Sequence, residues 1–181
     1  QTAFKFSDDR LILDNGHIKR TIRFSNDSVI SADLYLSGFD RNYLQQSSSE
    51  FQFMMNGVKV NGYSGWKLVS CSPLSDGSGG KGAVLILNGK GPADGVEIEL
   101  SYLSYSGLPL IRKKIAFTNK TLSDLKLEAV DVENLSLDLD YVSTWVYHNY
   151  ARMKHLGTYI GNWDDPIVVI HNTTLHAGLV L

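Results

Sequence analysis

Aromatic and hydrogen-bonding side chains are concentrated in the segment 143–155, STWVYHNYARMKH, and again in GNWDDP at 161–166. A sugar is recognised by such a mixture, because its C–H face stacks on an aromatic ring while its hydroxyls need polar partners. The ordinary alternative is an aromatic-rich strand and connector whose side chains only pack. The residues predicted to contact carbohydrate are Trp145, His148, Tyr150, Arg152, Trp163 and Asp164.

In this prediction the aromatic rings stack on the sugar, His148 and Arg152 donate to hydroxyls, and Asp164 accepts from them. The neighbouring pair Asp164 and Asp165 is a weaker candidate for acid–base catalysis, because adjacent residues on an extended chain point to opposite faces. An Asx turn leading into Pro166 explains the pair as well. Two other carboxylate pairs have the spacing of a solvated strand face: Glu97 with Glu99, and Asp138 with Asp140.

Other catalytic and cofactor motifs do not occur in the sequence. A zinc site needs three or four converging ligands, yet the five histidines show no HxH or HxxxH spacing. The single cysteine, Cys71, lies in an apolar run without an obvious base, and there is no GxSxG elbow. GSGGKG at 77–82 lacks the GxxxxGK[ST] pattern of a phosphate loop. We therefore expect no catalytic residue, no metal and no cofactor.

Composition restricts the classes of partner. Lys and Arg total 17 against 19 for Asp and Glu, and the charges are interspersed, so no basic surface for nucleic acid or an anionic membrane is predicted. No apolar run approaches the roughly 20 residues that span a bilayer. A neutral or small polar partner fits this chain best.

Alternation of apolar and polar residues, the period of a half-buried strand, recurs along the whole chain. Gly and Asn turn signals such as Asn56-Gly57 separate the runs. No window sustains an apolar face at helical spacing; the best, YARMKHLGTY, is broken by Gly157. We predict one all-β domain over residues 1–181, a large two-sheet antiparallel β-sandwich. The predicted strands are 17–24, 29–36, 50–55, 66–72, 83–88, 96–102, 110–119, 125–135, 143–150, 166–172 and 176–181.

Three local features refine this prediction. In LKLEAVDVENL the alternation slips by one residue, which predicts a β-bulge near Ala129. The composition of QQSSSE at 45–50 indicates a polar connector, and that of DGSGGKG at 76–82 a flexible loop. A start at Gln1 suggests that an upstream segment was removed, either by signal cleavage during export or by the choice of the expressed segment. The apolar end, LHAGLVL, leads us to expect a piece of a longer protein.

One motif resembles a known family. Residues 107–119 follow the pattern G-[LY]-P-x-[IL]-R-x-x-[IV]-x-[FV]-x-N, and a strand ending DVENLSL comes after them. The pattern is similar to the N-terminal β-domain of melibiase-type α-galactosidases, members of glycoside hydrolase family 36 and their relatives. The opening LDNGHIKRTIRF resembles an early strand pair of the same family.

The resemblance implies a galactose-mutarotase-like supersandwich in a secreted or periplasmic protein. In such enzymes two carboxylates of a downstream barrel carry the reaction, so the partners implied here are that catalytic domain and a galactoside or other saccharide. Two alternatives stay open. One is a stand-alone enzyme resembling aldose 1-epimerase, with His148 or His171 as base; the other is a structural module that forms a homo-oligomer.

Overall fold

A computed structural model describes residues 4–140, 142–148, 152–158 and 167–180 of the chain. The chain divides into two compact units, Gln1–Leu137 and Asp138–Leu181. One domain over residues 1–181 stays a prediction. Among the described residues no helix is long and apolar enough to cross a membrane.

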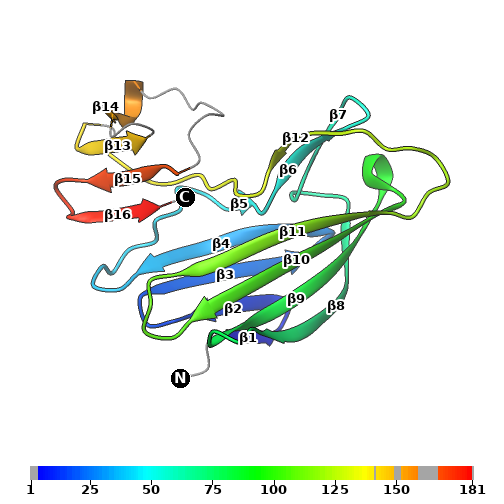
Figure 1. The fold of residues 1–181 in the computed structure, drawn as a ribbon, viewed down its shortest axis with the longest axis horizontal. Coiled ribbons are helices and arrows are strands. Elements are labelled where there is room, and N and C mark those ends of the chain that lie inside the picture. The colour runs from blue at the N-terminus through cyan, green and yellow to red at the C-terminus, as the bar shows by residue number, and fades with distance from the viewer. Residues whose placement is uncertain (1–3, 141, 149–151, 159–166, 181) are drawn as a thin grey trace. The chain divides into compact units, whose positions relative to one another are not determined.

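The first unit is built on two large antiparallel sheets, shown in blue and green in Figure 1. One has the order β1-β2-β3-β4-β5 and the other the order β11-β10-β9-β8. The first comprises β1 (Phe4–Ser7), β2 (Arg10–Asp14), β3 (Ile18–Ser25), β4 (Ser28–Leu36) and β5 (Ser48–Ser49). The second comprises β8 (Trp66–Ser75), β9 (Gly80–Gly89), β10 (Val96–Tyr105) and β11 (Ile111–Asn119), with a short 3-10 turn η1 (Gly91–Ala93).

A smaller third sheet completes this unit. It has the order β12-β6-β7 and contains β6 (Gln52–Met55), β7 (Val58–Asn61) and β12 (Leu127–Asp131). All three sheets contribute to one hydrophobic core, because alternate residues of each strand point inward. Its largest fully buried side chains include Trp66, Tyr102, Phe51 and Phe53. The predicted all-β antiparallel sandwich is therefore confirmed.

Local sequence signals correctly place two features. Asn56 and Gly57 join β6 to β7, and both have positive φ, 49° and 79°, as a tight hairpin turn requires. The register between β12 and β6 shifts between Glu128 and Asp131, and Ala129 has a φ of 47°. The predicted bulge near Ala129 is thus confirmed.

Two loop predictions are wrong in part. The polar connector predicted at 45–50 is limited to residues 45–47, because Ser48 and Ser49 form β5 and Glu50 is completely buried. In the segment 76–82, residues 76–79 form a tight β8–β9 turn and residues 80–82 begin β9; the Asp76 carboxylate accepts the backbone N–H groups of Ser78 and Gly80. In both cases hydrogen bonds satisfy polar groups that composition alone assigns to solvent.

The second unit contains one antiparallel sheet of order β14-β13-β15-β16. Its strands are β13 (Thr144–His148), β14 (Arg152–His155), β15 (Val169–Asn172) and β16 (Ala177–Val180), and a 3-10 turn η3 (Leu156–Thr158) follows β14. Thr144, Val146 and Asn172 are buried on one face of this sheet. The opposite face, which carries Trp145, is more exposed.

Candidate functional site

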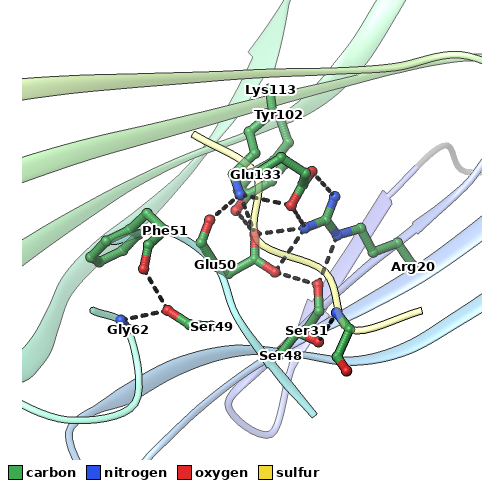
Figure 2. A network of polar contacts seen from close by, with 11 residues as sticks. Arg20, Ser31, Ser48, Ser49, Glu50, Phe51, Gly62, Tyr102, Lys113 and Glu133 are labelled. Atoms are coloured by element: carbon green, nitrogen blue, oxygen red, sulfur yellow. Dashed lines mark hydrogen bonds and ion pairs between the residues drawn. The ribbon is translucent and has the colours of Figure 1, made fainter. Parts of the chain in front are cut away.

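A cluster of charged side chains is buried inside the first unit. Its members, drawn as sticks in Figure 2, come from both large sheets, from the connection between β5 and β6, and from the segment after β12. We call it the charge cluster; it consists of Arg20 on β3, Ser31 on β4, Glu50 after β5, Tyr102 on β10, Lys113 on β11 and Glu133 after β12.

Glu50 lies at the centre of the charge cluster, and its side chain has no exposed surface. Its carboxylate accepts from Arg20 Nη2 at 3.0 and 2.9 Å and from Tyr102 Oη at 2.5 Å. It forms an ion pair with Lys113 Nζ at 2.9 Å, and the Ser31 hydroxyl donates to it as well. Both carboxylate oxygens therefore have several donors, as a buried anion needs.

Glu133 occupies the outer side of the charge cluster, where 28% of its side chain is exposed. Arg20 donates to its two oxygens at 2.6 and 2.8 Å, and Lys113 Nζ lies 3.3 Å away. Arg20 also donates through Nε to Ser31 Oγ at 2.9 Å. Two cations thus face two carboxylates, so the formal charges of the cluster cancel.

The electrostatic consequences are strong because the groups are buried. Burial alone would raise the pKa of Glu50, but Arg20 and Lys113 together with the hydrogen bonds from Ser31 and Tyr102 hold it well below its ordinary value. Burial opposes the charge on Arg20, yet Glu50 and Glu133 raise its pKa. Burial and the nearby Glu50 anion raise the pKa of Tyr102, which stays a neutral donor.

Hydrogen bonds next to the charge cluster attach the end of the first unit to β5. Ser136 N donates to Ser48 Oγ at 2.8 Å, and Gln45 N donates to Ser136 O at 2.9 Å. On the other side of Glu50, Ser49 Oγ donates to Phe51 O and accepts Gly62 N (Figure 2). The charge cluster therefore joins the two large sheets and holds the segment that leads out of the unit.

The described part of the predicted sugar contact does not share one face of its sheet. Trp145 and His148 lie on β13 three residues apart, so their side chains point to opposite faces. Arg152 is the register partner of His148, whereas Trp145 pairs with His155 and His171. Tyr150, Trp163 and Asp164 lie outside the described residues. The sugar contact of these six residues stays a prediction.

The two histidines considered as an epimerase base are also separated. His171 shares a face with Trp145, and His148 lies on the other face of the same sheet. Within the described ranges, no group of three or more His, Cys, Asp and Glu side chains is placed to hold a metal ion.

Sequence reasoning missed the charge cluster, although part of its signal is readable. Lys113 is in phase with Ile111, Ile115 and Phe117, which pack against the core, so its side chain must point inward. Arg20 has the same relation to Ile22. A charged residue at an inward position is the signal of a buried ion pair. No pattern distinguishes Glu50 within its serine run, or Glu133.

Comparison of the chain with known protein families, with curated proteins and with solved structures finds no significant match.

Proposed function

We propose that the chain is a non-catalytic β-sandwich from the N-terminal part of a secreted or periplasmic glycoside hydrolase of the α-galactosidase type. In this role it supports a catalytic barrel of the same polypeptide. The observation that carries the proposal is the charge cluster, whose acids and bases are occupied with one another rather than directed at a ligand.

A general acid or base must come within hydrogen-bond distance of its substrate. Glu50 is completely enclosed by donors of the protein itself, and Arg20 and Lys113 each keep only 6% of their side chains exposed. At the centre of this cluster, the charges and hydrogen-bonding groups are therefore paired within the protein and do not remain available for a substrate. The charged side chains of the cluster bind one another and so connect the two large sheets.

The family-like motif supports a structural role as well. It begins at the hairpin between β10 and β11, where Gly107 has a φ of 76° and Leu108 N donates to Tyr105 O. It ends at Asn119, whose side chain accepts Thr121 N at 2.8 Å and donates to Ser123 O at 2.7 Å. These motif residues shape the two ends of β11, so the motif is informative about fold.

The test is to read the coding sequence beyond Leu181 and to assay the longer polypeptide with and without residues 1–181. We expect a barrel-length domain to follow and an α-galactoside to be hydrolysed by the longer polypeptide only. Deletion of residues 1–181 should lower its thermal stability and its activity together. A reading frame without such a domain, or hydrolysis by the 181-residue chain alone, would overturn the proposal.

A further inference from the structure

The sheet of the second unit has two faces of very different composition. Residues on the face of Trp145 are identified by their register across the four strands. We call this set the Trp145 face; its members are Trp145, Tyr147, Met153, His155, Val169, His171, Gly178 and Val180. None of these residues is Asp, Glu, Lys or Arg. The opposite face carries buried Val146 and Thr144 and the cation Lys154.

Rings are aligned across the Trp145 face. Trp145 pairs in register with His155 on one side and His171 on the other. The rings of Trp145 and His155 are in contact and tilted relative to each other, with centroids 3.7 Å apart and an interplanar angle of 32°. The His171 ring lies over Gly178, since a Cβ at that glycine would come within 3.6 Å of His171 Cδ2. The rings of His155, Trp145 and His171 therefore form a row across the sheet that ends at Gly178, which has no side chain.

The next row of the Trp145 face is apolar and accessible. Tyr147 pairs with Met153 and with Val169, and Tyr147 and Met153 are 37% and 50% exposed. The tyrosine adds a phenolic hydroxyl to this row. The Trp145 face thus combines ring surfaces with the indole N–H, imidazole nitrogens and a phenol.

We propose that the Trp145 face binds a neutral pyranose sugar. A pyranose presents one C–H face to a ring and hydroxyls around its rim, which matches ring surfaces next to the indole, imidazole and phenol hydrogen-bonding groups. The absence of Asp, Glu, Lys and Arg from the Trp145 face selects against charged ligands, because such ligands gain most from an opposite charge. The choice of sugar class rests on the proposed function, while the residues are assigned by the geometry of this sheet.

Tyr147 and Met153 on the Trp145 face are exposed to solvent, so we expect this face to bind a sugar with low affinity. A monosaccharide has few atoms to contribute, and dissociation constants on the order of millimolar are expected. Nuclear magnetic resonance is the appropriate measurement in this range. The chain contains three tryptophans, and the indole N–H signal of each can be followed in one spectrum.

The experiment titrates the 181-residue chain with methyl α-galactopyranoside and methyl α-glucopyranoside. We expect the Trp145 indole signal to shift with at least one of them, while the signal of Trp66, which is 1% exposed in the other unit, does not move. Tyr147→Ala and His155→Ala should each weaken binding at least about tenfold. Lys154→Ala, on the neighbouring residue but the opposite face, should bind as the unchanged chain does.

Three results would overturn this inference: no shift of the Trp145 signal with either sugar, equal weakening by Lys154→Ala, or a shift that depends on protein concentration without sugar. The last would make the Trp145 face a contact between copies of the chain. Failure here leaves the accessory role intact, because that role is tested by the reading frame and the activity of the longer polypeptide.

Discussion

Replacement of Glu50 by glutamine tests the charge cluster most sharply, because the two side chains have nearly the same shape. In Glu50→Gln the cations Arg20 and Lys113 keep only Glu133 as a counter-ion, so the buried cluster gains one uncompensated positive charge. Removing one partner of a buried ion pair costs about 3–5 kcal/mol. The free energy of unfolding of a typical protein is only about 5–15 kcal/mol. Glu50→Gln is therefore expected to remove a large share of the stability of the first unit.

Unfolding in urea measures this cost, and Trp66 is the appropriate probe because it is buried in the core of the same unit. With Trp145 and Trp163 replaced by Phe, it is the only tryptophan left among the three in the chain. With a urea dependence of about 1–3 kcal/mol per molar, the midpoint should fall by at least about 1 M.

Glu97→Gln serves as a control, because it shows how much a Glu→Gln change costs where no buried charge is left unpaired. Glu97 is partly exposed and forms an ion pair with the exposed Lys120 at 3.2 Å, and such pairs at the surface contribute at most about 1 kcal/mol. Adding Lys113→Met to Glu50→Gln should recover part of the loss, because it removes the excess charge. The reasoning is refuted if Glu50→Gln destabilises the protein no more than Glu97→Gln, or if the added Lys113→Met only increases the damage.

Three further predictions follow from the same structure. Because the pKa of Glu50 in the folded protein lies below its ordinary value of 4.5, the stability it contributes is present above that pH. This contribution to the free energy of unfolding is lost as the pH falls below that value, at roughly 1.4 kcal/mol per pH unit for one proton. The urea midpoint, measured at successive acidic pH values, should therefore fall less in Glu50→Gln than in the unchanged chain. Glu133→Gln should destabilise the protein by less than Glu50→Gln, because the Glu133 side chain is partly exposed. It should also speed hydrogen exchange at the Ser136 amide, which donates to Ser48. Unchanged exchange at Ser136 would contradict the claim that the charge cluster holds the segment after β12 against β5. Gly82→Ala would place a Cβ 1.9 Å from the Tyr102 carbonyl oxygen, so at least about 1–3 kcal/mol of stability should be lost in thermal unfolding, and a neutral effect would contradict the close approach of β9 and β10.

The strands of the core could be predicted from the sequence because their alternation is long and regular. β3, β4, β10 and β11 lie within a few residues of their predicted ranges, since each buries one apolar face. Short strands were missed, because β1, β5 and β7 are only 4, 2 and 4 residues long and are defined by their partners. β14 falls in the segment that came nearest to a helical pattern, and its pairing with β13 determines its conformation instead.

The charge cluster could not be predicted from the sequence for a different reason. Lys113 and Glu133 are 20 residues apart, and Arg20 and Glu133 are 113 apart, so only the folded sheets bring them together. Local patterns can show that Lys113 points inward, but they cannot show which carboxylate it meets. Likewise, the spacing of Trp145 and His148 suggested one site until the strand geometry separated their faces.

The central claim is that the buried acids and bases of this chain hold its sheets together and do not catalyse a reaction. Polarimetry of freshly dissolved α-galactose with the 181-residue chain tests it most directly, because a stand-alone sugar epimerase would accelerate the change in rotation. We predict the same rate as in buffer, for the unchanged chain and for Glu50→Gln alike. A rate above buffer that disappears in a folded Glu50→Gln variant would contradict the account.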